Sequence, residues 1–194
     1  MGDTLKVSTT GMQRIEYLPE FYLSYDKTDS RRDATFLGAY SRKDNSLAGT
    51  VYKKIMGHFD ESINRYIWDA DVIVYRLAGV YLMMAEIANM EGGDVASYIN
   101  KIRERAYAKN WDATKYGYTN GNFTENELAI LHEKDKEMLG EGQRWYDLKR
   151  MTLTKGGKHL VFCPEGSKDG QKAILTEAEA YKLYWPIETN MITK

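Results

Sequence analysis

Apolar residues recur every three to four positions between Asp71 and Glu91, and this spacing predicts an amphipathic helix. The apolar stripe of this helix consists of Ile73, Leu77, Val80, Met84 and Ile87. Other apolar residues widen the stripe, so the helix is expected to be buried on more than one side: Tyr75, Leu82, Met83 and Ala88. Gly92 and Gly93 predict its end, because glycine is favoured just after a helix C-terminus.

A second helix is predicted directly afterwards, with Asp94 as its N-cap. Its apolar face consists of Val95, Ile99, Ile102 and Ala106, and its pattern fades near Lys109. Two helices joined by so short a turn must pack antiparallel. This helical hairpin has the size of one tetratricopeptide-like repeat, although the sequence holds no second copy of it.

A third and longer helix is predicted from Thr124, which forms a capping box with Glu127, to about Arg150. Gly140 and Gly142 interrupt this pattern, and a glycine inside a helix costs about 1 kcal/mol relative to alanine. A kink or a close backbone contact is therefore expected there. The rest is predicted to be loop, with a short strand over residues 159–163 and an apolar end over residues 181–187.

Turn-forming and charged residues dominate the first 66 positions, where no helical stripe persists. Short apolar pieces in this part are expected to be strands or loop anchors. The pattern as a whole predicts a mainly α fold in three parts: a loop-rich segment over residues 1–66, a helical core over 67–150, and a loop and terminal segment over 151–194.

Composition and charge exclude several classes of protein. The 194 residues are 43% hydrophobic and 28% charged, which is typical of a globular chain, and the formal net charge is -1. No basic cluster is present, so nucleic acid is not an expected partner. No apolar run reaches the roughly 20 residues that span a bilayer, and the first residues do not form a signal peptide. The single cysteine, Cys163, is expected to be a buried and inert thiol.

No motif for catalysis, a cofactor or a metal site is present. The three histidines lack the spacing of zinc ligands, and Gly140-Glu141-Gly142 lacks the strand and the third glycine of a dinucleotide-binding loop. Glu133, Glu137 and Glu141 share one helix face, with lysines interspersed, and this pattern is expected to be a solvated charged surface. The chain is therefore predicted not to be an enzyme.

Four segments, in order, carry a resemblance to a known family. Residues 75–86 (YRLAGVYLMMAE) resemble a helix with the pattern R-L-A-D-V-Y-L-x-x-A-E, in which Gly79 replaces the aspartate. Residues 99–106 (INKIRERA) are similar to I-N-x-V-R-x-R-A, and residues 137–150 (EMLGEGQRWYDLKR) to E-L-x-x-E-G-x-R-W-x-D-L-x-R. Residues 185–187 (WPI) resemble a closing W-P-I-P, with Glu188 in place of the second proline, and residues 29–33 (DSRRD) resemble an upstream D-x-R element. The chain thus resembles the SusD/RagB family of outer-membrane nutrient-binding lipoproteins.

The resemblance implies that this chain is the C-terminal part of a longer, surface-exposed outer-membrane lipoprotein, whose signal and lipid anchor are not in this chain. It implies an oligosaccharide ligand and a SusC-like TonB-dependent transporter as the partner. Two alternatives remain open: a scaffold that docks the transporter without a sugar site, and a peptide-binding member of the family. The charged signature residues Glu141, Arg144 and Asp147 are expected to be structural, with Arg103 or Arg105 reaching acids on a neighbouring helix.

Tyrosine is the compositional outlier, with 15 residues against five phenylalanines, and tyrosine suits binding surfaces that have one wet end. Sugar sites of the family use aromatic rings that stack on pyranose faces, in loops that no motif marks. The candidate ligand-binding residues are therefore loop aromatics: Trp111, Trp68, Tyr66, Tyr40, Tyr25 and Tyr22. No catalytic residue, metal ligand or cofactor is predicted.

Overall fold

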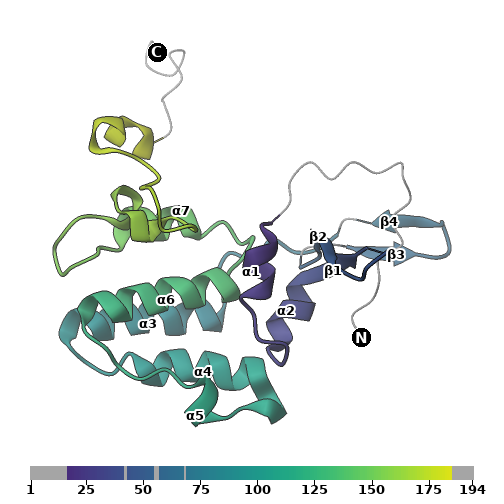
Figure 1. The fold of residues 1–194 in the computed structure, drawn as a ribbon, viewed down its shortest axis with the longest axis horizontal. Coiled ribbons are helices and arrows are strands. Elements are labelled where there is room, and N and C mark those ends of the chain that lie inside the picture. Colours follow the sequence, from purple (N-terminus) through teal and green to yellow (C-terminus); the bar gives the residue numbers. More distant parts are fainter. Residues whose placement is uncertain (1–16, 42, 55–56, 68, 185–194) are drawn as a thin grey trace.

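The computed structural model describes residues 17–184 apart from 42, 55, 56 and 68, and it is mainly helical, as predicted. Helices α3 (Leu77–Glu91), α4 (Ala96–Tyr107) and α6 (Phe123–Glu137) lie side by side (Figure 1). The short helix α7 (Arg144–Arg150) contacts both α6 and the 3-10 helix η2 (Leu160–Phe162). These elements form the main body of the described chain.

The predicted helical hairpin is confirmed, since α3 and α4 pack against each other. Gly92 has a φ of 73°, and its N–H donates to the carbonyls of Ala88 and Asn89, so this glycine ends α3 in the left-handed conformation. The N-cap of α4 is Val95, one residue after the predicted Asp94, whose carboxylate accepts a hydrogen bond of 3.2 Å from the backbone N–H of Ser97. The N-terminus of α3 was predicted wrongly: the helix begins at Leu77, and not at Asp71.

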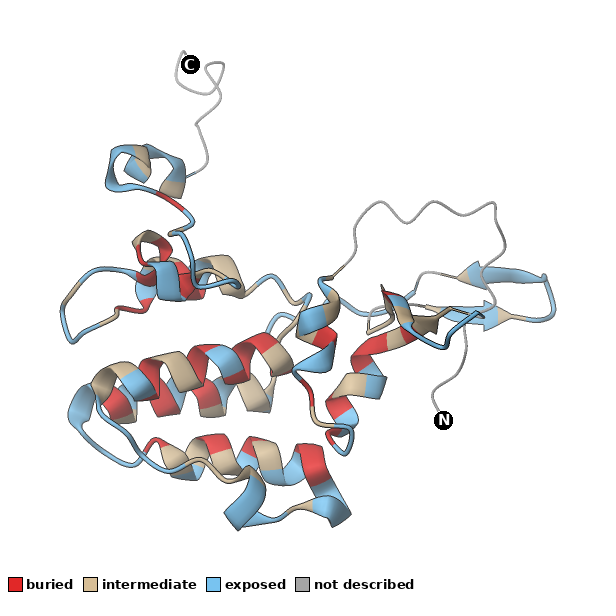
Figure 2. Ribbon diagram, viewed as in Figure 1, coloured by how far each residue is buried: buried red, intermediate tan, exposed pale blue. Residues whose placement is uncertain are grey.

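The core lies between the three long helices, but α3 turns a different face to it than the spacing predicted. Leu82 and Ala85 are fully buried against residues of α4 and α6, including Ile99, Ile130 and Leu131. The predicted core stripe is largely exposed instead, with Leu77 65% and Ile87 57% accessible (Figure 2). Because α3 is apolar on most of its circumference, the spacing could not show which apolar stripe is covered.

The long third helix is two helices, so the prediction of one continuous helix is wrong. Helix α6 ends at Glu137, and α7 begins at Arg144. Between them, Gly140 and Gly142 have φ values of 76° and 75°, which other residues adopt only with strain. The predicted close backbone contact is confirmed at Gly140, where a Cβ atom would overlap the hydroxyl of Tyr52. The capping box of α6 lies two residues earlier than predicted, between Asn122 and Glu125.

The N-terminal part contains more regular structure than its composition suggested. Helices α1 (Pro19–Leu23) and α2 (Ser30–Thr35) precede an antiparallel hairpin of β1 (Phe36–Tyr40) and β2 (Leu47–Tyr52), in which Gly38 pairs with Thr50. A second hairpin joins β3 (His58–Asp60) to β4 (Arg65–Ile67). Phe36 lies at the centre of an aromatic cluster that packs α1 against the β1–β2 hairpin through edge-on ring contacts. The cluster contains Tyr17, Phe21, Tyr22, Tyr25 and Tyr52.

The C-terminal part consists of loops and short 3-10 helices. The strand predicted over residues 159–163 is absent from the described chain: Thr152 and His159 form one isolated bridge, and the helix η2 follows. The other short elements are η1 (Ala108–Asn110), α5 (Ala113–Tyr116), η3 (Pro164–Gly166) and η4 (Glu177–Leu183). Cys163 is buried, and burial raises the pKa of its thiol, as expected for an inert cysteine. The predicted apolar end at residues 185–187 lies outside the described residues.

Candidate functional site

Helix α6 presents a ladder of acidic residues that is buried, and not solvated as its charge pattern suggested. The side chains of Glu133 and Glu137 on α6, and of Glu141 just beyond it, are each only 2% exposed. Buried carboxylates require cationic partners, because an unpaired charge in the interior is very unfavourable. The partners come from residues far away in the sequence, which is why the spacing of the glutamates alone could not identify a buried face.

Arg31 on α2 is the central partner of this ladder. Its Nη1 atom lies 2.6 Å from Glu133 Oε1 and 3.3 Å from Glu137 Oε2, while Nε and Nη2 bind both carboxylate oxygens of Asp29. Burial alone would lower the pKa of the Arg31 guanidinium, but the surrounding carboxylates raise it further above its usual range. Arg31 is therefore permanently charged and joins α2 to α6.

Other cationic side chains also bind the three glutamates of the ladder. Arg103 Nε donates to Glu133 at 2.8 Å, and Arg105 donates to Glu137, so both predicted contacts from α4 to a neighbouring helix are confirmed. Arg76 and Lys54 bind Glu141, and Arg76 also binds Glu137. Burial would raise the pKa of Glu137 and Glu141, but these hydrogen bonds and charges hold both below the usual range.

The remaining signature residues also bind protein groups. Arg144 pairs with Asp135 and donates to the carbonyl of Gly166 at 2.7 Å. Asp147 accepts from Lys134 at 2.6 Å and from Arg150 at 2.9 Å. These contacts agree with the structural role expected for the signature residues, since Arg144 joins α7 to α6 and η3, and Asp147 joins α7 to α6 through Lys134.

A cleft of about 790 Å³ lies beside the ladder, between α1, α6 and the loops that follow α4 and η3. Four aromatic residues line it: Tyr17, Phe21, Tyr107 and Tyr116. Tyr107 and Tyr116 stack with ring centroids 3.9 Å apart, and the hydroxyl of Tyr116 lies 3.0 Å from Thr28 Oγ1. The cleft is large enough for a ligand of several rings, because small-molecule sites commonly measure about 300–1,000 Å³.

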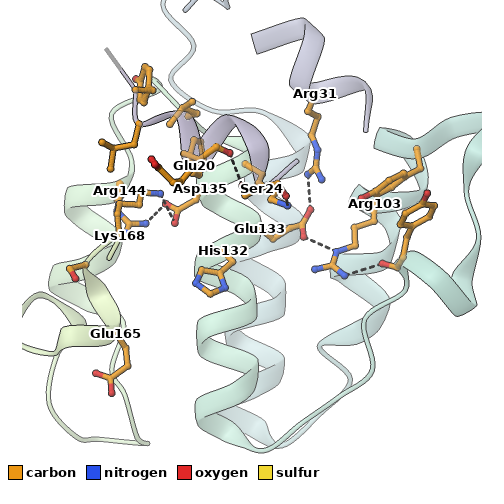
Figure 3. A pocket seen from close by; sticks show the side chains of 18 of the residues that line it. Glu20, Ser24, Arg31, Arg103, His132, Glu133, Asp135, Arg144, Glu165 and Lys168 are labelled. Carbon is orange, nitrogen blue, oxygen red and sulfur yellow. Dashed lines mark hydrogen bonds and ion pairs between the residues drawn. The ribbon is translucent and has the colours of Figure 1, made fainter. Parts of the chain in front are cut away.

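The imidazole of His132 lies on α6 in the cleft, which Arg144 and Lys168 also line (Figure 3). Lys168 Nζ lies 2.8 Å from Asp135 Oδ2 and 4.3 Å from the ring centroid of Phe21. Lys136 Nζ donates to the carbonyl of Ser24 at 2.8 Å. Desolvation lowers the pKa of His132, and the cations around it act in the same direction, so the imidazole is neutral at pH 7.

The five described residues of the six predicted to bind ligand do not gather at one site, although the hydroxyls of Tyr22 and Tyr40 lie 3.4 Å apart. Tyr22 and Tyr25 are buried in the aromatic cluster around Phe36, where the hydroxyl of Tyr25 donates to the carbonyl of Lys136 at 2.9 Å. Tyr40 is half-buried at the end of β1, and Tyr66 is exposed on β4 beside Phe59. Trp111 is half-buried next to Tyr107, and Trp68 lies outside the described residues. Ligand contact by these six residues stays a prediction.

None of the five described candidates lines the cleft, so sequence reasoning missed the residues that do. Tyr116 lies five residues after Trp111, between α4 and α6, and was not among the candidates. His132, Lys136 and Lys168 belong to mixed-charge stretches that resemble any solvated surface. His132 and Lys136 lie one turn apart on α6, and Lys168 reaches this helix through Asp135, a contact that no local signal predicts.

The described residues lack both a metal-binding group and a membrane-spanning helix. Over residues 17–184 with the gaps named above, no three histidine, cysteine or acidic side chains are grouped so as to hold a metal ion. The same part of the chain contains no helix with the length and hydropathy required to cross a bilayer.

Comparison with known proteins places the chain in a family. The SusD family model matches residues 38–194. A SusD-like protein of Formosa agariphila is 37% identical over 131 residues, which are 59% of this chain and 24% of that protein. The starch-binding protein SusD of Bacteroides thetaiotaomicron is 32% identical over 124 residues, which are 64% of this chain and 20% of that protein.

Solved structures give the same result. A SusD superfamily protein from Bacteroides fragilis is 51% identical, with a TM-score of 0.85 over 94% of this chain and 39% of that one. NanU from the same species is 26% identical, with a TM-score of 0.65 over 89% of this chain and 36% of its own. The chain therefore spans less than two fifths of these relatives. Since the family model covers most of its length, this chain belongs to the SusD family.

Proposed function

We propose that this chain is part of a cell-surface oligosaccharide-binding protein that captures glycans without cleaving them. The observation that carries the proposal is family membership over residues 38–194, with a relative named as a starch-binding protein. The cleft beside α6 supports it, because it combines aromatic rings with hydrogen-bonding side chains. Rings such as those of Phe21 and Tyr116 suit the apolar face of a pyranose, and the polar groups suit its hydroxyls.

The state of the carboxylates in the cleft supports binding over hydrolysis. Glycoside hydrolysis requires one carboxyl group that holds a proton and another that acts as nucleophile or base. Glu133 is engaged by Arg31 and Arg103, and Asp135 by Arg144 and Lys168. Both carboxylates are therefore occupied by cations of the protein, and neither is free to act on a glycosidic bond.

The proposal extends to the setting of the complete protein. Members of the SusD family are outer-membrane surface lipoproteins, and we propose the same location and a SusC-like TonB-dependent transporter as the partner. The loop-rich, helical and terminal segments of this chain would then form the C-terminal part of a larger domain. Two observations support this: the chain covers only 39% of its 51% identical relative, and the apolar stripe of α3 is exposed. Further helices packed on that stripe would bury it.

Isothermal titration calorimetry against a panel of neutral and acidic oligosaccharides tests the proposal. We expect saturable binding of one glycan class, which Tyr116→Ala weakens at least tenfold. Trp111→Ala and Tyr66→Ala serve as matched aromatic controls, because neither residue lines the cleft. Loss of binding in these controls, but not in Tyr116→Ala, would move the site to the loop aromatics. Absence of binding to every glycan would contradict the proposed function and favour a scaffold or a peptide-binding role.

A further inference from the structure

The charge of the cleft differs from the charge of the chain. The whole chain has a formal net charge of -1, whereas the cleft is lined by six lysine and arginine side chains and only four acidic ones. The cations are Arg31, Arg103, Lys115, Lys136, Arg144 and Lys168, and the acids are Glu20, Glu133, Asp135 and Glu165. A concave surface with an excess of one charge raises the local concentration of ligands with the opposite charge.

The two inner acids do not cancel this excess, because each is already shared between two cations. Glu133 lies 2.6 Å from Arg31 and 2.8 Å from Arg103. Asp135 pairs with Arg144 and lies 2.8 Å from Lys168. Arg31 is compensated further by Asp29 and Glu137, so the excess positive charge lies with Arg144 and Lys168, which share the one carboxylate of Asp135. The two remaining acids are exposed and form no ion pair with any described residue.

Lys136 has a cationic head without a carboxylate partner among the described residues. Its Nζ donates to the carbonyl of Ser24 and lies 5.2 Å from the ring centroid of Tyr25. A carbonyl and a ring face compensate an ammonium less well than a carboxylate does. Desolvation lowers the pKa of Lys136, which is the consequence of a cation held near apolar groups without full compensation.

His132 lies on α6 one turn before Lys136, and both line the cleft. The charges of Lys168, Arg144 and Lys136 act on its imidazole, against the single carboxylate of Asp135. It is exposed and forms no hydrogen bond to another described side chain, so its N–H group is free to donate to a ligand. The ring of Phe21 lies beside Lys168 and supplies an aromatic face next to a cation.

We infer that this cleft selects acidic oligosaccharides, with a sugar carboxylate received between His132, Lys136 and Lys168 and a pyranose ring against the aromatic wall. The inference rests on the proposed function, because it names the class of glycan that the same site binds. An uronic acid or another carboxylated sugar offers both features that the cleft provides: a ring with an apolar face and one negative charge.

The test is calorimetric titration of the protein with tetragalacturonate, tetramannuronate and sialyllactose, each beside a neutral counterpart. The counterparts are the methyl esters of the two oligouronates, and lactose. Methyl esterification keeps the sugar ring and removes the charge, so it isolates the contribution of the carboxylate. We expect at least one acidic glycan to bind ten times or more tightly than its counterpart, and its affinity to fall as sodium chloride rises from 50 to 500 mM.

Lys136→Met is the matched variant, because it removes the charge and keeps an aliphatic side chain of similar length. It is expected to weaken the acidic glycan at least tenfold and to leave a neutral one unchanged, while Lys172→Met, exposed and outside the cleft, changes neither. Equal affinity for acidic and neutral forms, or binding of neutral glycans alone, would overturn the inference and leave the proposed function intact. Absence of binding to every glycan would overturn both.

Discussion

Arg31 Nη1 lies 2.6 Å from Glu133 Oε1 and connects two helices that are 102 residues apart in the sequence. Arg31 also binds Asp29 and Glu137, so one guanidinium serves three buried carboxylates. The same ladder forms one wall of the cleft, since Arg31, Arg103 and Glu133 all line it. The ion-pair network therefore connects the helices of the fold and also forms part of the candidate site.

Replacement of Arg31 should destabilise the fold strongly. Arg31→Ala leaves three carboxylates without their shared cation, and removal of one partner from a buried pair costs about 3–5 kcal/mol. Arg32→Ala is the matched control, because the Arg32 partner, Asp33, is 62% exposed and such surface pairs contribute about 0–1 kcal/mol. Urea denaturation followed by circular dichroism measures both free energies of unfolding. An equal loss in the free energy of unfolding in both variants would contradict the conclusion that Arg31 is the main partner of the buried carboxylates.

The acidic ladder predicts a loss of stability at low pH. The pKa of Glu137 is lower in the folded chain than its ordinary value of 4.5, so folding favours the ionised form. The resulting stability is fully present above about pH 4.5 and is lost as the pH falls through the folded pKa. Thermal unfolding between pH 3 and 7 measures it.

Glu137→Gln should lower the melting temperature at pH 7, and its difference from wild type should be smaller at pH 3, because folding favours the ionised carboxylate less as the pH falls. Glu104→Gln, on the exposed side of α4, provides the comparison and should shift the melting temperature little at either pH. A difference between wild type and Glu137→Gln that stays constant over the whole pH range would show that the ion pairs of Glu137 do not cause the acid sensitivity.

The two glycines between α6 and α7 should respond differently to the same substitution. At Gly142, φ is 75° and nothing lies within 4 Å of an added Cβ, so Gly142→Ala should cost only the strain of the left-handed conformation, about 1–2 kcal/mol. Gly140→Ala has the same strain and also displaces the hydroxyl of Tyr52, which adds about 1–3 kcal/mol for overpacking. Combining Gly140→Ala with Tyr52→Phe should recover part of that loss. Chemical denaturation of the three variants gives these differences, and a Gly140→Ala no worse than Gly142→Ala would refute the steric contact.

The two sides of α3 should also differ in their contribution to stability. Leu82 is fully buried, and Leu82→Ala should cost about 2–5 kcal/mol, the range of large-to-small core substitutions. Ile87 is 57% exposed in this chain, so Ile87→Ala should cost less than about 1 kcal/mol. Denaturation of this chain tests both values. In a longer protein that packs further helices on the stripe, Ile87→Ala should cost as much as a core substitution, and an unchanged small cost there would contradict the proposed packing.

Local patterns in the sequence predicted the α3–α4 hairpin, but not which helix faces are covered or which distant segments meet. The spacing of apolar residues and the position of Gly92 predicted the hairpin of α3 and α4, because both signals depend only on residues close together in the sequence. The covered face of α3 did not follow, since apolar residues on most of the helix make several faces equally suitable. The break after Glu137 is governed by the positive φ values of Gly140 and Gly142, and a helical pattern that resumes beyond the glycines concealed it.

The candidate site was less predictable than the fold for a physical reason. Buried and solvated glutamates have the same spacing on a helix, and only the arrival of Arg31 and Arg103 from distant segments distinguishes them. The cleft likewise depends on α1 lying beside α6. The signature segments revealed the family, because they contain residues of the ion-pair network. No motif marks the cleft residues His132, Lys136 and Lys168.

Calorimetric titration of the protein with neutral and acidic oligosaccharides is the most direct test of the glycan-binding role proposed for this member of the SusD family. We predict saturable binding of one class, favouring the carboxylated members, and a loss of at least tenfold on Tyr116→Ala. The contradicting result is a folded protein that gives no heat of binding with any glycan and binds a peptide or a transporter instead. That result would rule out the proposed glycan-binding role.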